Sequence, residues 1–350
     1  MAMTRREFVK VSSVLAAALG VKHALRRSPE ALAAEGAPQV VWLQCQSCSG
    51  CSVSLLNTIR FGTIDQVLTN TIDLQYHPTL MAGAGDAAVQ AALAAKAKGG
   101  YILVVEGSIP TGNMAGACYL WPGTTALAGV KAFAAKAKFV IAVGTCASYG
   151  GIYAGKPNPT GAKGVRAAIG KPKAPLVNLP GCPAHPDWIL DTVGYILTNR
   201  KAPSLDSNGR PKAYYRALVH DNCTWKSSYV GPRHHSGGRA CTVCHDRGRR
   251  GDDEGEGIGN HVIATYLSDP GCMWGLGCKG TATHADCPIR RWNAGSATGA
   301  GVNWCIGAKS PCHGCTEPKF PDGMSPFYTL EVPLAPGGWD DEDDEDGDDD

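Results

Sequence analysis

The fifteen cysteines of this sequence, and their positions along the chain, constrain what it can fold into more than any other feature. Cys48 and Cys51 form a C-x-x-C pair that follows an apolar run, and Cys146 and Cys182 follow two further apolar runs. Disulfide bonds are the usual use of cysteine in exported proteins. C-x-x-C spacing and placement after apolar runs favour metal ligation instead.

Residues 38–200 alternate between short apolar runs and alanine-rich stretches. The apolar runs predict strands and the alanine-rich stretches predict helices: strands at 40–43, 101–105, 139–143 and 176–179, helices at 86–98 and 125–138. Continuous apolar strands that alternate with helices indicate a parallel sheet covered on both faces. We therefore predict an α/β fold with a flavodoxin-like, doubly wound parallel sheet.

Ligands of such a sheet bind beyond the carboxyl ends of its strands, where these cysteines are expected to lie. Four thiolates from three adjacent strand ends, Cys48, Cys51, Cys146 and Cys182, are able to converge on one cubane iron–sulfur cluster. Glycines beside them let the backbone approach a cluster closely. One such cysteine alone is more often buried and inert, whereas four in this arrangement predict a cluster site.

The periodic pattern ends near residue 200, and the remaining chain is rich in glycine, proline, cysteine and tryptophan. Its apolar pattern is too sparse for a conventional core, and metal clusters can supply the missing cross-links. The candidate ligands here are an H-x-x-C pair and six later cysteines: His220, Cys223, Cys272, Cys278, Cys287, Cys305, Cys312 and Cys315. We predict an irregular C-terminal domain organised by iron–sulfur clusters.

The first residues have the form of an export signal. A twin-arginine segment at 4–10 precedes an apolar stretch at 11–21, and Ala31-Leu32-Ala33 resembles a cleavage site. We expect export to the periplasm by the twin-arginine route. No apolar run long enough to span a membrane follows, so we expect no transmembrane anchor in the mature chain.

The last eleven residues contain ten carboxylates, which predicts a self-repelling, disordered tail. The whole chain has a formal charge of +2, and no basic stripe with interleaved aromatics indicates nucleic-acid binding. The expected organisation is a signal peptide at 1–34, a flavodoxin-like domain at 35–200, a second cluster domain at 201–335 with an insertion at about 224–271, and an acidic tail at 336–350.

Several segments resemble the small subunits of nickel–iron hydrogenases, and the similarity covers roughly residues 38–328. They are Trp42-Leu43-Gln44 before Cys48, Glu106-Gly107-Ser108-Ile109-Pro110, Gly144-Thr145-Cys146, Pro180-Gly181-Cys182-Pro183, Gly277-Cys278-Lys279-Gly280 and Ser325-Pro326-Phe327-Tyr328. The resemblance implies three clusters. Cys48, Cys51, Cys146 and Cys182 would ligate a proximal 4Fe–4S cluster; His220, Cys223, Cys272 and Cys278 a distal 4Fe–4S cluster; and Cys287, Cys312 and Cys315 the medial cluster.

Cys305 stands where many of these relatives have proline, so a fourth medial thiolate is available. We therefore expect a medial 4Fe–4S rather than 3Fe–4S cluster, as in the nickel–iron–selenium branch. Oxygen-tolerant relatives have extra cysteines at positions that correspond to Gly50 and Gly151. These two glycines argue against a modified 4Fe–3S proximal centre.

The resemblance implies an electron-transferring subunit of a periplasmic hydrogenase with no catalytic residue of its own. Its partners would be a large subunit that carries the nickel–iron site and an external acceptor such as a periplasmic c-type cytochrome. One alternative is an iron–sulfur electron carrier without hydrogenase activity, related to the quinone-reductase subunits of respiratory complexes, which lack the second half. A disulfide-rich secreted binding protein is another alternative.

Some residues remain unassigned by these patterns. Cys45 and Cys118 have no predicted role, and Glu106 at a strand end is open to a proton-transfer role or a structural one. Cys241-Thr242-Val243-Cys244-His245 is a c-type haem signature, although its polar flanks favour a disulfide or zinc-binding hairpin.

Overall fold

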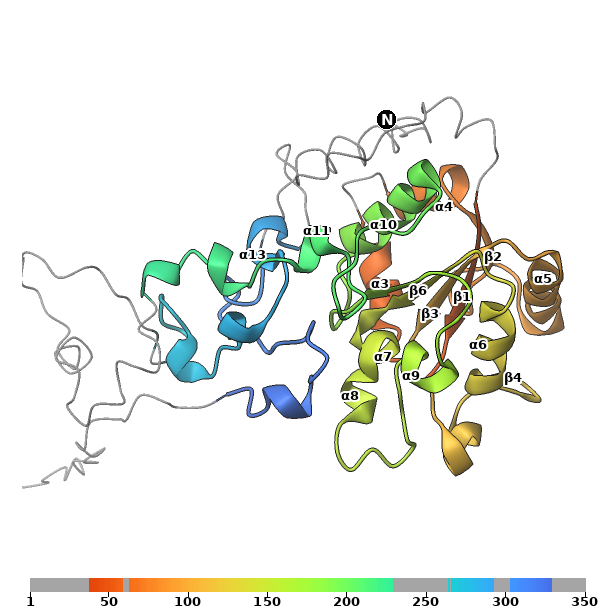
Figure 1. Ribbon diagram of the computed structural model, residues 1–350. Coiled ribbons are helices and arrows are strands. Elements are labelled where there is room, and N and C mark those ends of the chain that lie inside the picture. Colours follow the sequence, from red (N-terminus) through yellow and green to blue (C-terminus); the bar gives the residue numbers. More distant parts are fainter. Residues whose placement is uncertain (1–37, 59–62, 229–263, 265, 293–302, 329–350) are drawn as a thin grey trace, which may run out of the picture.

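The computed structural model describes residues 38–58, 63–228, 264, 266–292 and 303–328. The first half contains a five-stranded sheet in the order β2-β1-β3-β6-β7 (Figure 1). Every strand pair in this sheet is parallel. Its strands are β1 (Gln39–Gln44), β2 (Asp73–Tyr76), β3 (Ile102–Glu106), β6 (Phe139–Val143) and β7 (Leu176–Leu179). This is the flavodoxin-like order, so the predicted α/β fold with a flavodoxin-like parallel sheet is confirmed.

The four apolar runs that the sequence marks as strands are β1, β3, β6 and β7. The edge strand β2 was not predicted, because Asp73-Leu74-Gln75-Tyr76 mixes polar and apolar residues and is only partly buried. A separate two-stranded ribbon pairs β4 (Tyr119–Trp121) with β5 (Thr124–Thr125). The predicted helices correspond to α5 (Gly85–Lys98) and to α6 (Ala126–Ala134), which ends earlier than expected.

Alternate residues of β1 lie in two different apolar cores, one on each face of the sheet. Val41 and Leu43 belong to a core with the alanines of α5 and with α6, which we name the second core. Val40 and Trp42 belong to the first core, which also contains α3 (Gly50–Leu56) and α10 (Pro186–Asn199). Figure 1 shows α3 and α10 on one side of the sheet and α5 and α6 on the other.

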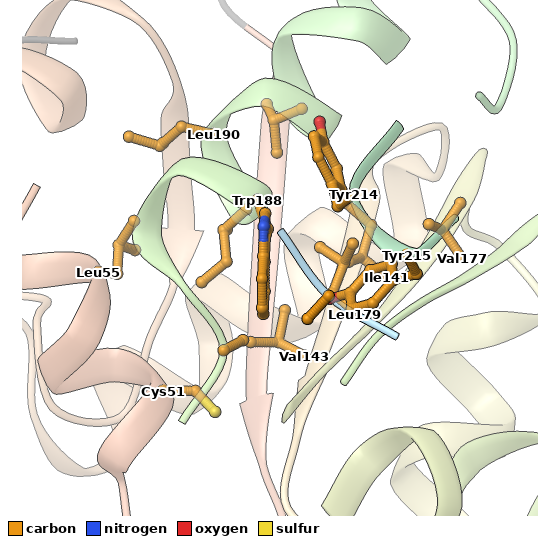
Figure 2. Packing of buried hydrophobic residues seen from close by; sticks show 14 of the residues in the cluster. Cys51, Leu55, Ile141, Val143, Val177, Leu179, Trp188, Leu190, Tyr214 and Tyr215 are labelled. Carbon is orange, nitrogen blue, oxygen red and sulfur yellow. The ribbon is translucent and has the colours of Figure 1, made fainter. Parts of the chain in front are cut away.

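Trp188 of α10 is the largest fully buried side chain of the first core. Figure 2 shows it in the middle of this core, with Tyr214 and Tyr215 on one side and Leu55 on the other. Tyr214 and Tyr215 lie after α10, so the first core joins the sheet to the second half of the chain. The remaining helices of the first half are α4 (Ile64–Asn70), η1 (Gly112–Ala117), α7 (Gly144–Tyr149), α8 (Gly151–Ala154) and α9 (Val165–Ile169).

After α10 the described chain has only short helices, as the loss of periodicity predicted. They are α11 (Lys212–Tyr215), η2 (His220–Asn222), η3 (Lys226–Ser228), η6 (Trp274–Leu276), η7 (Gly280–Ala282), α13 (Cys287–Arg290) and η8 (Asp322–Met324). Among the described residues, no helix is both long and apolar enough to cross a membrane. The proposed signal peptide, the haem signature and the acidic tail lie outside the described residues, and the domain boundaries remain predictions.

Candidate functional site

Four cysteines meet at the carboxyl ends of the strands, as the sequence predicts. Cys48 and Cys51 follow β1, Cys146 lies in α7 directly after β6, and Cys182 follows β7. The thiols are close enough to interact electrostatically: Cys51 with Cys146 and Cys182, and Cys48 with both of these. Burial, more than any neighbouring charge, raises the pKa of Cys146 to about 12. We name this set the strand-end group.

Glycines leave the space around the strand-end sulfurs free of side chains. A Cβ atom added to Gly144 would lie 2.5 Å from the Sγ of Cys51, and one added to Gly151 would lie 2.7 Å from the Sγ of Cys146. Both glycines also have positive φ angles, 82° and 54°. A side chain at either position would crowd the sulfur of Cys51 or Cys146 and strain the backbone.

Glu106, at the end of β3, anchors the loop that carries Cys48 and Cys51. Its buried carboxylate accepts six hydrogen bonds from two backbone amides and four side chains: the amides of Cys51 (3.1 Å) and Ser52 (3.2 Å), the indole of Trp42 (2.9 Å), the amide of Gln44 (3.2 Å) and the hydroxyls of Ser47 (3.2 Å) and Ser52 (2.5 Å). These contacts make Glu106 a positioning residue for the first two ligands. Of the two roles left open for Glu106, the contacts favour the structural one.

His77 is linked to Glu106 through the hydroxyl of Ser52, and no sequence pattern indicates this histidine. Its Nδ1 accepts a hydrogen bond from the amide of Thr79 (3.2 Å), so its Nε2 donates to the hydroxyl of Ser52 (3.1 Å), which donates to Glu106. Burial lowers the pKa of His77 to about 4, although the nearby Glu106 acts to raise it. His77 is therefore a neutral donor at physiological pH, and nothing in its local sequence marks it.

A second group of four cysteines lies in the C-terminal half. The thiol of Cys287, at the start of α13, interacts electrostatically with those of Cys315, Cys312 and Cys305. Burial is the largest cause that raises the pKa of Cys315, to about 12. We name this set the middle group, and Cys305 belongs to it because its thiol lies near that of Cys287.

The third group lines one pocket, together with Met273, Trp274 and Ile306. Its ligand candidates are His220, Cys223, Cys272 and Cys278. Burial lowers the pKa of His220, and the neighbouring Lys226 adds to this effect, so its imidazole is neutral and able to bind a metal. We name this set the outer group.

Two hydrogen bonds to sulfur join the three groups in series. The amide of Cys182 in the strand-end group donates to the thiol of Cys315 in the middle group. The amide of Cys312 in the middle group donates to the Sγ of Cys278 in the outer group, at 3.4 Å. Thr145, beside Cys146, also donates to the backbone carbonyl of Cys315. The middle group therefore lies between the other two.

Five of these cysteines share one local geometry, in which the amide two residues further on donates to the sulfur. The donor and acceptor pairs are Gly50 with Cys48, Trp225 with Cys223, Trp274 with Cys272, Gly280 with Cys278, and Gly314 with Cys312. Such bonds stabilise a thiolate and tune a cluster bound to it. The local backbone is therefore already arranged for anionic sulfur.

The donor sets fit iron–sulfur clusters better than single metal ions. Among the described residues, no three His, Cys, Asp or Glu side chains are close enough to hold one ion. Thiolates around a single tetrahedral ion are about 3.8 Å apart, given bonds of about 2.3 Å, whereas those on the corners of a cubane are further apart. All thirteen described cysteines are free thiols, which contradicts the disulfide-rich alternative for this part of the chain.

The structure also places the unassigned cysteines. The thiol of Cys45 is buried in the second core and interacts electrostatically with that of Cys118 and with Glu106. Burial raises the pKa of both thiols, so both are protonated. The haem signature, Cys241, Cys244 and His245, lies outside the described residues.

The two halves of the chain match two different protein families. Residues 48–196 match the family of the NADH ubiquinone oxidoreductase 20 Kd subunit, and residues 258–328 match the C-terminal family of NiFe/NiFeSe hydrogenase small subunits. The chain is 37% identical over 352 aligned positions to the periplasmic [NiFeSe] hydrogenase small subunit of Desulfomicrobium baculatum, covering 95% of this chain and 100% of that protein. The chain belongs to the nickel–iron and nickel–iron–selenium hydrogenase small subunits.

Further relatives agree with this membership. The periplasmic [NiFe] hydrogenase small subunit of Solidesulfovibrio fructosivorans is 39% identical, with 93% of each chain covered. The solved structure of the reduced, active Desulfomicrobium baculatum Ni-Fe-Se hydrogenase has a TM-score of 0.68 at 36% identity, and covers 85% of this chain and 100% of that chain. As a hydrogenase small subunit, the chain binds iron–sulfur clusters and transfers electrons together with a large subunit. The C-terminal match separates it from the quinone-reductase alternative.

Proposed function

We propose that this small subunit holds three iron–sulfur clusters and relays electrons between the nickel–iron site of its large subunit and an external acceptor in the periplasm. The strand-end group would hold the proximal cluster, the middle group the medial cluster and the outer group the distal cluster. Each cluster, when bound, accepts and releases one electron at a time. The protein sets their order, spacing and surroundings.

The observation that carries this proposal is the serial contact between the three ligand groups. One hydrogen bond links Cys182 to Cys315 and another links Cys312 to Cys278, so neighbouring groups are in direct contact. The twelve ligand candidates divide into three sets of four without a remainder, and one set contains a histidine. A neutral imidazole in place of a thiolate raises the potential of the cluster it holds. This favours the outer group as the point where electrons leave.

We propose a 4Fe–4S cluster for the middle group because four thiols are present. Cys305 interacts electrostatically with Cys287 and Cys315, so its thiol lies near two of the other three ligands. Burial raises the pKa of Cys305, as it does for the other members of the group. A fourth thiolate allows the cluster to keep the iron that a three-ligand site would lack.

The surface around the strand-end group supports docking of the large subunit there. Cys48 and Cys182 are exposed although they are ligand candidates. Val53 and Ile152 lie near Cys51 and Cys146, and their side chains are 55% and 51% exposed. Exposed apolar side chains beside exposed ligands indicate a surface that a partner covers.

For the outer group we propose a basic c-type cytochrome as the acceptor, steered by the acidic tail at residues 340–350. The relatives named above are periplasmic proteins, and the twin-arginine segment supports the same location for this chain. Acceptor reduction should fall steeply as salt concentration rises, and deletion of residues 340–350 should weaken this dependence. Identical salt dependence with and without the tail would contradict steering.

The test of the proposed function is hydrogen-dependent viologen reduction by the complex purified from the periplasm through this chain. We expect activity to co-purify with a larger subunit, together with about twelve iron atoms per complex outside the nickel–iron site. Low-temperature EPR then assigns the cluster types. A brown, cluster-loaded chain without hydrogen activity or a large partner would overturn the proposal.

A further inference from the structure

A buried ion cluster lies beside the middle group and is not explained by ligand binding. Arg290, at the end of α13, contacts three aspartates. Its Nη2 and Nε donate to Asp286 at 2.8 and 3.0 Å, and its Nη1 lies 3.2 Å from Asp187 and 3.4 Å from Asp191. All four residues are at most 8% exposed. The guanidinium also lies 5.2 Å from the centre of the Tyr214 ring.

This cluster joins the two halves of the chain at two ligands. Asp187 and Asp191 belong to α10, which begins four residues after Cys182, whereas Arg290 ends the one-turn helix α13 that begins with Cys287. The backbone of α13 starts from Asp286, whose carbonyl accepts from the amide of Arg290 at 2.8 Å. Arg290 therefore holds the helix of one middle-group ligand against the helix that follows a strand-end ligand.

Two further hydrogen bonds hold the same pair of helices together. Trp188 of α10 donates its indole N–H to Asp286 at 2.8 Å, and Figure 2 shows its ring fixed inside the first core. His185, the N-cap of α10, accepts the amide of Asp187 at Nδ1, so its Nε2 donates to the carbonyl of Arg291 at 2.6 Å. The segment from Cys182 to Asp191 thus contacts both ends of α13.

A loop with only one helical turn has little regular structure to fix its ligand. A guanidinium that bridges three carboxylates has a planar, directional geometry that an ammonium group cannot reproduce. Fixed charges near a cluster also shift its potential, because negative charge favours the oxidised form and positive charge the reduced form. Arg290 and its three aspartates are therefore able both to hold Cys287 in place and to shift the potential of a cluster bound to it.

We propose that Arg290, with Asp187, Asp191 and Asp286, is a positioning device that fixes Cys287 relative to Cys182 and sets the reduction potential of the medial cluster. This inference rests on the proposed assignment of Cys287 to the medial cluster. It predicts opposite effects from removing the two kinds of charge. Arg290→Gln lowers the midpoint potential of the medial cluster, and Asp191→Asn raises it.

The experiment is a redox titration of the intact, anaerobic heterodimer followed by low-temperature EPR, for the wild type, Arg290→Gln and Asp191→Asn. Asp86→Asn, on the exposed surface of α5, is the control for loss of a carboxylate. We expect one of the three titrating signals to shift in opposite directions in the two variants and the control to match the wild type. Arg290→Gln should also alter the magnetic interaction between the proximal and medial signals.

Unchanged potentials in both variants, with or without a loss of thermal stability, would overturn the proposal and leave a merely structural ion cluster. If the Arg290→Gln heterodimer fails to assemble, Asp191→Asn alone tests the proposal. This substitution changes the longest contact of Arg290 with the aspartates, 3.4 Å, and keeps the shape of the side chain. An upward shift then supports the proposal and no shift overturns it. The absence of three cluster signals from the wild type would instead overturn the proposed function.

Discussion

Replacing Glu106 with glutamine tests whether this carboxylate positions the proximal ligand loop. The glutamate oxygens face only donors, three at each oxygen. A glutamine offers one acceptor and one NH2 group in the same space. If its nitrogen replaces the oxygen near Cys51, it faces two backbone amides. If its nitrogen replaces the other oxygen, it faces the indole of Trp42, which can only donate.

The magnitude follows from these contacts. In either orientation at least one buried donor loses its acceptor, at a cost of about 1–3 kcal/mol. The three bonds that remain at the amide oxygen become neutral, and each loses roughly 1 kcal/mol relative to a bond with a charged acceptor. Because such terms are not additive, we expect a total destabilisation of about 3–5 kcal/mol. With an unfolding entropy of about 2.1 cal/mol/K per residue, roughly 300 residues give about 1.6 °C per kcal/mol, so the unfolding temperature falls by about 5–8 °C.

The assay is a thermal scan of the anaerobic heterodimer at one fixed rate, because cofactor loss makes the unfolding irreversible. Glu106→Gln should cost about 1–3 kcal/mol less in a Trp42→Phe background, since phenylalanine removes the donor that the amide group opposes. Trp121→Phe, which changes a ring packed against the second core, is the control background, and in it the cost of Glu106→Gln should stay the same. Equal falls in all three backgrounds would refute the reasoning, as would an unchanged unfolding temperature for Glu106→Gln.

Three further predictions concern His77, Gly151 and Cys305. Because burial lowers the pKa of His77 to about 4 from 6.5, the unfolded chain binds a proton that the native chain does not between these values. The native state is therefore destabilised by acid. Its free energy of unfolding is unaffected by His77 above pH 6.5 and falls by about 3 kcal/mol on acidification to pH 4. His77→Gln should therefore lose less unfolding temperature than the wild type between pH 7 and 4.5, and parallel curves would contradict this. Gly151→Ala should reduce the iron content because its Cβ would lie 2.7 Å from the Cys146 sulfur. Gly170→Ala is the matched control, because Gly170 has a φ of 77° and open space around it. Equal iron contents in the two variants would contradict the need for glycine beside the Cys146 sulfur. Cys305→Ser should remove about one iron and give the EPR signal of an oxidised 3Fe–4S centre. Cys118→Ser should leave the iron content unchanged, and a full iron content in Cys305→Ser would show that Cys305 is not a ligand.

The buried parts of the sheet were predictable from the sequence because their pattern is set by local chemistry. Strands covered on both faces must be continuously apolar, and β3 and β6 are buried at every residue. The edge strand β2 has one buried residue and three partly buried ones, so its sequence follows no such rule. The early end of α6 was also beyond prediction, since Ala135, Lys136 and Ala137 favour a helix as much as the residues before them.

The strand-end group was predictable because topology alone brings the carboxyl ends of parallel strands together. The roles of Glu106, His77 and Arg290 were not. Each depends on at least one partner between 25 and 103 residues away, and a single carboxylate, imidazole or guanidinium in a sequence carries no sign of it. For the middle and outer groups the chain has almost no regular structure, so the resemblance to a family supplied the ligand sets that spacing could not.

The two halves of the chain differ in what holds their ligands. Cys48, Cys51, Cys146 and Cys182 follow strands of a sheet with two apolar cores, so the fold of the sheet itself brings them together. The ligands of the middle and outer groups lie in loops and one-turn helices, and their fixed contacts are N–H···S bonds and a few anchors such as Arg290. Binding free energy in such a site is also folding free energy. The N–H···S bond between Cys182 and Cys315 then links the sheet half to the middle group, so the fold of the sheet helps to orient one ligand of that group.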